Sequence, residues 1–292
     1  MPERARLVDY HTQTIEHGLA KPRRVRETVQ AAVNAGLTTI CLTDHFPLPP
    51  GLVDPTAEKD CAMPATDYPD YQQEVDETMR EFGGRITVLR GAEVDWLPQH
   101  RSWITEQLAA WPFDYVIGSV HFLGRIIDDK GDRNLLLDYD EAEFQRGIDY
   151  YWGIQPLAVA YFQQVRGMVQ SGLFDGVGHL DLVKKYDDRG LFSQDEPWYR
   201  RAVLETLDTI ASSPMSIEIN AAGLDKKCKE AYPAPWILQE ARARNIPLTT
   251  GSDGHTPEGI GRNLNVAMEL ARAAGYNHIV EYRERRQVIV AI

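Results

Sequence analysis

Seven short apolar segments recur along this chain of 292 residues, and each ends in an imidazole, a carboxylate or both. They are rich in β-branched residues, and several are apolar throughout, which is typical of parallel strands buried on both faces. The segments span residues 6–12, 38–45, 86–96, 115–122, 176–181, 215–221 and 247–255. Stretches with the apolar spacing of amphipathic helices separate them, at residues 25–37, 68–82, 101–110, 141–171, 198–212, 235–245 and 262–274.

This alternation predicts an α/β protein. Seven strand–helix units without a linker favour a closed β/α barrel in a single domain over residues 1–292. An open doubly wound sheet is the alternative, but the first strand runs into DYHTQTIEHG rather than the GxGxxG turn of a dinucleotide-binding sheet. Residues 47–70 are rich in Pro and Asp and lack periodicity, so we expect a loop or lid insertion there, and residues 288–290 predict a last strand.

The charge balance excludes several classes of partner. The chain has 31 Lys and Arg against 43 Asp and Glu, a net charge of −12, and so has no electrostatic reason to bind nucleic acid or an anionic membrane. We expect neither a signal peptide nor a transmembrane helix, because its apolar runs are strand-sized. The three cysteines are odd in number and far apart, which indicates a reducing, cytoplasmic location without a disulfide framework.

The polar residues at the strand ends are the strongest functional signal. In a β/α barrel the carboxyl ends of all strands meet at one face, where catalysis takes place. Crowded imidazoles and carboxylates are costly to bury unless divalent cations compensate them, and two or three ions at such a mouth are typical of phosphate-ester hydrolysis. The candidate ligands are His11, His17, His45, Glu93, His121, His179, Asp253 and His255.

In their order along the chain, these motifs resemble those of the PHP (polymerase and histidinol phosphatase) phosphoesterases. The counterparts are the opening HTQ, TDH, the GAE strand, SVH, GH and SDGH. The longer strings GHLDLVKKY, EINAAGL and YPAPWIL resemble the histidinol-phosphate phosphatase branch of that family. The resemblance implies a distorted (β/α)7 TIM-like barrel with a trinuclear metal site.

The resemblance also implies how the ligands are shared among the metals. One metal would be held by His11, Gln13, Glu93 and Asp253, a second by His17, His45 and His255, and a third by His121 and His179 with Glu93 bridging. The metals would be zinc, manganese or iron, since imidazole-plus-carboxylate sites accept all three. The chain departs from the family pattern at Gln13, where the family has histidine, and at Asp225, where the branch often has arginine.

The activity implied by the resemblance is that of a phosphoric monoester hydrolase. It would convert L-histidinol phosphate to L-histidinol and phosphate in histidine biosynthesis, by attack of a metal-bridging hydroxide. The resemblance gives catalytic roles to His11, Glu93, Asp253 and His255, and the candidate substrate-binding residues are Arg166, Lys226, Lys227 and Arg262.

Other functions remain compatible with the sequence. The substrate could be a different small phosphomonoester, and Gln13 could mark a catalytically weakened metal-binding protein. A nucleic-acid exonuclease would share the fold but would require basic patches, which this sequence lacks. The sequence leaves the number of metals and the oligomeric state undecided.

Overall fold

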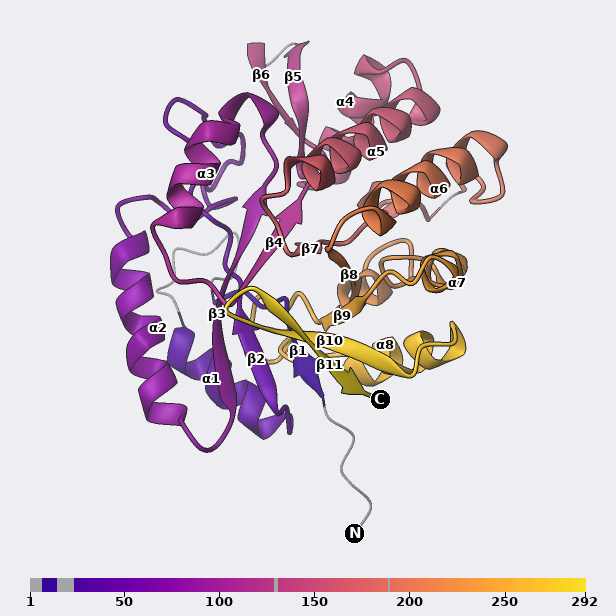
Figure 1. Ribbon diagram of the computed structural model, residues 1–292. Helices are drawn as coiled ribbons and strands as arrows, with labels where there is room; N and C mark the ends of the chain where they lie inside the picture. Colours follow the sequence, from indigo (N-terminus) through magenta and orange to yellow (C-terminus); the bar gives the residue numbers. More distant parts are fainter. Residues whose placement is uncertain (1–6, 15–23, 129–130, 189) are drawn as a thin grey trace.

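Seven parallel strands form a nearly closed barrel in the computed structural model, which describes residues 7–14, 24–128, 131–188 and 190–292 (Figure 1). Neighbouring strands follow the order β1, β2, β3, β4, β7, β8, β9. Their bounds are β1 (Val8–Asp9), β2 (Thr39–Leu42), β3 (Thr87–Asp95), β4 (Tyr115–Ser119), β7 (Gly176–Val177), β8 (Ser216–Asn220) and β9 (Leu248–Gly251). The α/β barrel expected from the sequence is confirmed, although several strands are shorter than their apolar segments.

Backbone hydrogen bonds join the last strand to the first. The Tyr10 amide donates to the Thr250 carbonyl at 2.9 Å, and the Asp253 amide donates to the His11 carbonyl at 2.8 Å. The hydroxyl of Thr250 adds a bond to the Val8 carbonyl at 2.8 Å. Because of this closure, the residues that follow β1 and β9 lie side by side at one mouth of the barrel.

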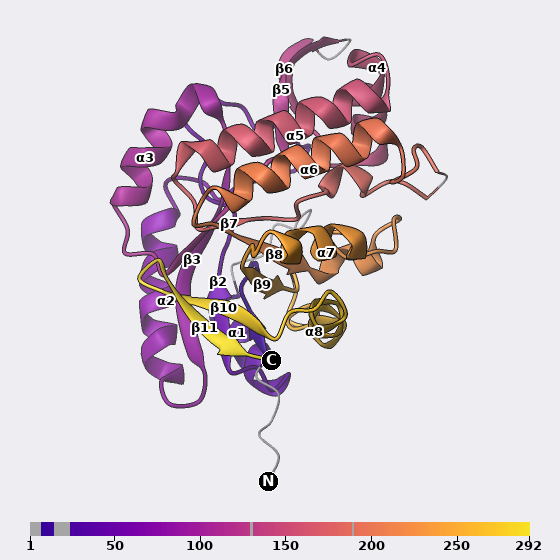
Figure 2. The ribbon, with the colours of Figure 1, turned by 45° about the vertical axis from the view of Figure 1, so that its right-hand side comes forward.

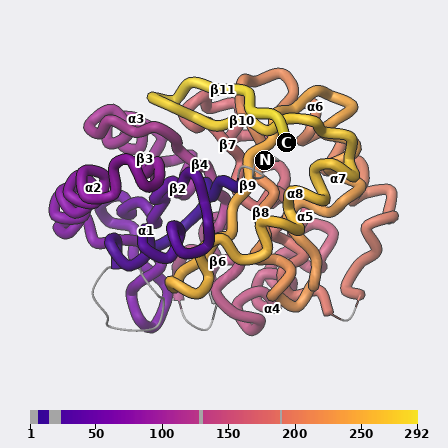
Figure 3. Tube along the Cα trace, turned by 90° about the horizontal axis from the view of Figure 1, so that it is seen from below, coloured from indigo at the N-terminus to yellow at the C-terminus, as the bar shows by residue number. Residues whose placement is uncertain are grey.

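Helices cover the outside of the barrel (Figures 2 and 3). They are α1 (Val25–Asn34), α2 (Tyr68–Phe82), α3 (Arg101–Ala109), α4 (Glu141–Tyr150), α5 (Ile154–Ser171), α6 (Pro197–Ala211), α7 (Pro235–Ala243) and α8 (Leu264–Ala273), with short 3₁₀ turns η1 (Pro98–His100), η2 (Leu182–Lys184) and η3 (Ala221–Asp225). Figure 2 shows α5, α6, α7 and α8 following one another down one side. Their apolar faces bury against the strands, as the helical spacing predicted.

The single helix expected over residues 141–171 is two helices. Trp152 and Gly153 both have positive φ, at 64° and 138°, so the backbone leaves the right-handed helical region between α4 and α5. Asp140 caps the start of α4 by accepting a hydrogen bond from the Glu143 amide. Gly172 ends α5 in the left-handed conformation with φ 70°, which glycine adopts without strain.

Among the described residues, two antiparallel hairpins are added to the barrel, one at each end. The hairpin of β5 (Phe122–Asp128) and β6 (Gly131–Leu136) was not predicted from the sequence. The other pairs β10 (His278–Arg283) with β11 (Arg286–Ala291), and β11 contains the strand predicted at residues 288–290. Tyr282 of β10 donates its amide to the Tyr10 hydroxyl and its own hydroxyl to the Asp175 carbonyl, just before β7. The C-terminal hairpin therefore covers the amino ends of the strands, opposite the mouth formed by their carboxyl ends.

The segment from residue 47 to the start of α2 contains only turns and bends and is held by its own side chains. Asp54 accepts hydrogen bonds from the Thr56 amide and hydroxyl and from the Cys61 amide. The Tyr139 hydroxyl donates to Glu58 at 3.1 Å, which ties this loop to the linker between β6 and α4. No helix within the described ranges is long and apolar enough to cross a membrane.

Candidate metal centre

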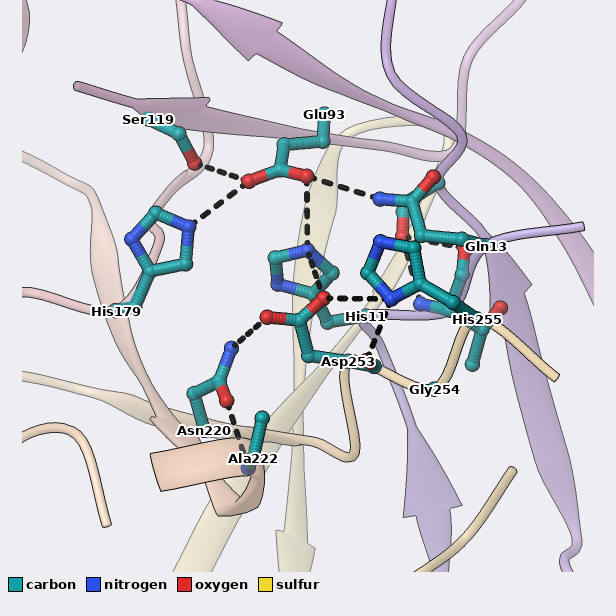
Figure 4. A network of polar contacts seen from close by, with 12 residues as sticks. His11, Gln13, Glu93, Ser119, His179, Asn220, Ala222, Asp253, Gly254 and His255 are labelled. Carbon is teal, nitrogen blue, oxygen red and sulfur yellow. Dashed lines mark hydrogen bonds and ion pairs between the residues drawn. The ribbon is translucent and has the colours of Figure 1, made fainter. Parts of the chain in front are cut away.

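The carboxylate of Glu93, near the end of β3, lies at the centre of the polar cluster at the barrel mouth (Figure 4). Glu93 is 2% exposed. Its Oε1 accepts a hydrogen bond from the Ser119 hydroxyl at 2.7 Å and lies 3.0 Å from His179 Nε2. His121 Nε2 lies 3.4 Å from the same oxygen. One side of this carboxylate is therefore surrounded by two imidazoles and a hydroxyl.

The second oxygen of Glu93 faces residues that follow the first two strands. Its Oε2 lies 3.0 Å from His11 Nε2 and 3.2 Å from His45 Nδ1. The side-chain amide of Gln13 donates to the same oxygen at 2.9 Å. Four histidines that the sequence analysis selected thus converge on the two oxygens of one buried carboxylate.

This arrangement fits divalent cations. His45, Glu93 and His121 each offer a ligand atom, and these atoms lie within 4.8 Å of one another. His121 Nε2 and His179 Nε2 lie only 3.1 Å apart, although at most one proton can lie between two such nitrogens. Imidazole nitrogens and carboxylate oxygens that face one common space are the donor set preferred by zinc and similar metals.

Gln13 is placed differently from the expected metal ligand. Its carbonyl oxygen accepts a hydrogen bond from the His45 amide at 3.0 Å, so the oxygen that would bind a metal is directed at the backbone. Its NH₂ group faces Glu93 instead. An NH₂ group has no lone pair for a cation, so in this orientation Gln13 supports Glu93 rather than ligating a metal.

Asp253 and His255 follow β9 on the same side of the pocket. Asp253 Oδ1 lies 3.5 Å from His11 Nε2, and its Oδ2 accepts a hydrogen bond from the Asn220 amide at 3.1 Å. His255 Nδ1 lies 3.0 Å from the Asp253 carbonyl oxygen, and the His255 ring lies 6.0 Å from that of His45. His17, the remaining predicted ligand, lies outside the described residues.

The backbone at two candidate ligands is strained. His179 and Asp253 have φ values of 21° and 53°, in the region that residues with a Cβ rarely occupy. Each such residue costs on the order of 1–3 kcal/mol and persists only where its surroundings determine it, most often at functional sites. This strain supports a functional role for the two positions.

Burial and opposite charges shift the pKa values within the cluster. Burial alone would raise the pKa of Glu93, yet His11 and His45 hold it well below its usual range. Burial would lower the pKa of His11, but Asp253 and Glu218 raise it well above its usual range. For His121 the effect of burial is outweighed by Asp138 and Asp95, which raise its pKa to about 10. Without metal, these shifts favour the protonated forms of His11 and His121 and the ionised form of Glu93.

Two further carboxylates contact the imidazole nitrogens that face away from Glu93. Asp95 Oδ1 lies 2.9 Å from His121 Nδ1, and Glu218 Oε2 lies 2.9 Å from His11 Nδ1. In both pairs the Nε2 of the ring is directed at Glu93. Neither Asp95 nor Glu218 was among the predicted site residues, although both stand at strand ends, in GAEVD and EIN.

A pocket of about 600 Å³ opens over the cluster. Its walls come from the loop before α2, the linker after β6, and the segments that follow β7 and β8. These walls include Thr56, Glu58, Asp60, Cys61, Leu136, Asp138, Tyr139, Asp140, Leu182, Lys185, Ala222, Lys226 and Tyr232. Lys185 donates to Asp138 Oδ2 at 2.9 Å. Neither residue was among the predicted site residues; Lys185 lies within the GHLDLVKKY motif, whereas no motif marks Asp138.

Of the predicted substrate-binding cations, Lys226 lines the pocket. Lys227 instead forms ion pairs with Glu141 and Asp188, outside the pocket lining. Its charge is engaged by α4 and by the loop before α6, so the geometry does not support a phosphate contact by Lys227.

The two predicted arginines also lie elsewhere. Arg166 is on α5, where it donates to the Thr206 hydroxyl of α6 at 3.1 Å, so it joins two outer helices instead of reaching the mouth. Arg262 is 59% exposed and pairs with Asp225, with Nε 2.8 Å from Oδ2. The sequence positions of Arg166 and Arg262 did not indicate in which direction their side chains extend.

Comparison with known proteins places the chain in a family. The model of the PHP domain matches residues 9–222. A protein of Deinococcus radiodurans named "Probable histidinol-phosphatase" is 35% identical over 276 residues, covering 94% of this chain and 95% of that protein. The histidinol-phosphatase of Bacillus subtilis is 32% identical over 267 residues, covering 89% of this chain and 96% of that protein.

A solved structure shows the same fold. The histidinol phosphate phosphatase of Lactococcus lactis, crystallised with zinc, L-histidinol and phosphate, superposes with a TM-score of 0.72. The alignment covers 97% of this chain and 99% of that one, at 22% sequence identity. With the barrel, the order of its motifs and the extent of the PHP match in agreement, this chain belongs to the PHP domain family.

Proposed function

We propose that this protein is a metal-dependent phosphomonoesterase that hydrolyses L-histidinol phosphate to L-histidinol and phosphate, a step of histidine biosynthesis. The observation that carries the proposal is the convergence of histidines from separate strands on Glu93, beneath a pocket of about 600 Å³. The volume suits a small ligand. The names of the relatives from D. radiodurans and B. subtilis support the choice of substrate.

The residues that would hold the metals form two groups around Glu93. His11 and Asp253 lie near Oε2 of Glu93, and His121 and His179 lie near its Oε1. His45 also lies near Oε2, and the His255 ring lies next to that of His45. We propose two or three ions, with zinc first and manganese or iron as alternatives. Such ions lower the pKa of water toward about 7 and neutralise phosphate oxygens.

The chain's own residues have distinct tasks in this proposal. Lys226 attracts the phosphate from the pocket wall as a point charge. Asp95 and Ser119 hold His121 and Glu93 in fixed orientations, so the site needs little rearrangement when substrate binds. The loop that carries Thr56 and Cys61 covers the pocket and limits the entry of water. The acidic net charge does not oppose an anionic substrate, because bound cations reverse the local sign.

A different small phosphomonoester is the second candidate. Asp225, at the position where the resemblance expects an arginine, pairs with Arg262 and is not part of the pocket lining. In place of a bidentate guanidinium contact, the phosphate would then meet the point charge of Lys226, a departure from the branch pattern that keeps other small phosphomonoesters as candidates. All three cysteines are free in the structure, and we propose a reducing, cytoplasmic environment on that basis.

One experiment tests the proposal. The purified protein is supplemented with zinc, dialysed and analysed for metal, and phosphate release is then measured with histidinol phosphate and a panel of other phosphomonoesters. We expect at least two ions per chain and the highest kcat/KM for histidinol phosphate. Fewer than two ions would exclude the multinuclear mechanism, and a preference for another substrate would transfer the assignment to the second candidate.

Matched variants make that result specific. Glu93→Gln should lose both metal and activity, because Glu93 touches both groups of ligands. Glu281→Gln makes the same chemical change at a residue that is also 2% exposed but lies on β10, at the opposite end of the barrel. It should retain metal and activity, and equal losses in the two variants would indicate a general folding defect.

A further inference from the structure

We propose that Glu218 is a positioning residue that fixes the tautomer of His11 and joins three candidate ligands into one rigid unit. The inference rests on the proposed function in one respect, that the site binds metal, and it is independent of which phosphomonoester is hydrolysed. Glu218 lies on β8, is fully buried, and belongs to none of the ligand groups described above.

The contacts of Glu218 reach three strands. Its Oε2 lies 2.9 Å and its Oε1 3.1 Å from His11 Nδ1, after β1. Its Oε1 accepts the His179 backbone amide at 2.7 Å, after β7. The same Oε1 accepts the Asn220 side-chain amide at 2.9 Å, and that amide also donates to Asp253 after β9. One carboxylate thereby links His11, His179 and Asp253, whose own strands are far apart in the sequence.

A carboxylate at this position decides which nitrogen of His11 carries the proton. An ionised carboxylate can only accept, so His11 donates from Nδ1, and once the ring is neutral its Nε2 holds the lone pair that a metal requires. Nε2 is the nitrogen that lies 3.0 Å from Glu93 and 3.5 Å from Asp253. Second contacts of this kind are known to raise the basicity of a ligating histidine and to set its orientation.

Gly251 of β9, which has no side chain, leaves room for the contact between Glu218 and His11. A Cβ added at Gly251 of β9 would lie 2.5 Å from the His11 Cβ and 3.0 Å from Glu218 Oε2. Both side chains therefore pack directly against a position that only glycine can fill without displacing them. The close approach fixes the separation between the carboxylate and the imidazole independently of the hydrogen bonds.

Replacement of Glu218 by glutamine tests the tautomer directly. Glutamine keeps the shape and can still accept from His179 and Asn220 through its oxygen, but its NH₂ group then faces His11 Nδ1. That NH₂ group is a donor, and the remaining oxygen, 3.1 Å from His11 Nδ1, is shared with the His179 and Asn220 amides. The variant therefore favours the tautomer of His11 with its proton on Nε2, where it blocks the metal. The fold should persist, because the side-chain volume is unchanged.

The measurement is zinc affinity by chelator competition, with cobalt-substituted protein giving an absorption spectrum that reports ligand geometry. We expect Glu218→Gln to bind zinc roughly 10–100-fold more weakly and to alter the cobalt spectrum, with circular dichroism checking that the metal-free variant is folded at the assay temperature. Glu281→Gln serves as the buried control and should change neither readout.

A double-mutant cycle separates positioning from a general structural role. If Glu218 acts through His11, its replacement should weaken zinc binding far less in a His11→Ala background than in the parent. Additive losses in the cycle, or unchanged zinc affinity and cobalt spectrum in Glu218→Gln, would overturn the proposal. Failure of the parent protein itself to bind zinc would instead remove the proposed function, so the two failures are distinguishable.

Discussion

His121 Nε2 lies 3.1 Å from His179 Nε2, and both nitrogens face Oε1 of the same buried carboxylate, that of Glu93. Asp95 holds the other ring nitrogen of His121 at 2.9 Å. In the absence of metal, Asp138 and Asp95 raise the pKa of His121 and so favour its charged form, which the Glu93 carboxylate stabilises. A divalent cation can replace that charge once His121 loses its proton.

Zinc binding should therefore release protons. The pKa of His121 is raised to about 10, so near pH 7 this ring is protonated in the metal-free protein and must lose its proton to ligate. Calorimetric titration with zinc in buffers of different ionisation enthalpy should show at least one proton released per chain, and zinc affinity should fall as pH falls. Heats that do not depend on the buffer would show that the imidazoles were already neutral.

Metal removal should also change how stability depends on pH. The folded pKa of His121 lies above its ordinary value of 6.5, so its stabilising effect is complete below that value and is lost as pH rises through about 10. The melting temperature of chelator-treated protein should drop across this range. Metal-loaded protein should hold its melting temperature there, because the cation replaces the protons. Parallel curves for the two forms would contradict this prediction.

Gln13 should matter for stability and for metal content in different ways. Gln13→Leu leaves the His45 amide and Glu93 Oε2 each without one partner, at a cost of about 1–3 kcal/mol, measurable by chemical unfolding of the metal-free protein. Gln13→His offers a ring nitrogen near Glu93 and should retain more metal after dialysis. If the histidine variant gains no metal, the position is not able to reach a cation.

Lys226 and Lys227 are adjacent in sequence but differ in location, which makes them a matched pair. Lys226 lines the pocket, whereas Lys227 is paired with Glu141 and Asp188. Lys226→Ala should raise the KM for the phosphomonoester about tenfold, as expected for the loss of one charge-assisted contact. Steady-state kinetics of Lys227→Ala should be close to those of the parent, and the reverse ranking would refute the assignment of Lys226.

Lys184 should be a strong determinant of stability. It is 2% exposed, and its Nζ lies 2.9 Å from Asp181 and 2.7 Å from Glu230. Lys184→Met leaves the fully buried Asp181 without its counter-charge and should cost about 3–5 kcal/mol in the free energy of unfolding. Lys227→Met breaks a solvent-exposed ion pair and should change the free energy of unfolding far less than Lys184→Met. Similar costs in both variants would show that the Lys184 network is not a compensated buried charge.

Local pattern was sufficient for the barrel and for most of the candidate ligands. Apolar runs of strand length specify where parallel strands lie, and the carboxyl ends of such strands must share a mouth, so His11, His45 and His179 could be grouped without coordinates. Local pattern failed where backbone conformation interrupts an apolar run. Positive φ at Trp152 and Gly153 divides one expected helix, and the β5–β6 hairpin was not predicted at all.

The amino-acid sequence by itself determined the family, the barrel and the types of ligand atom, because periodicity and residue chemistry are local properties. Only the tertiary structure decided how side chains are oriented and paired. In the folded protein the side-chain oxygen of Gln13 accepts from the His45 amide, and the Glu218 carboxylate contacts Nδ1 of His11. Arg166 binds Thr206 of α6, and Lys226 lines the pocket. These outcomes depend on which partners lie within about 3 Å in space, and such distances arise only once strands remote in the sequence are packed together.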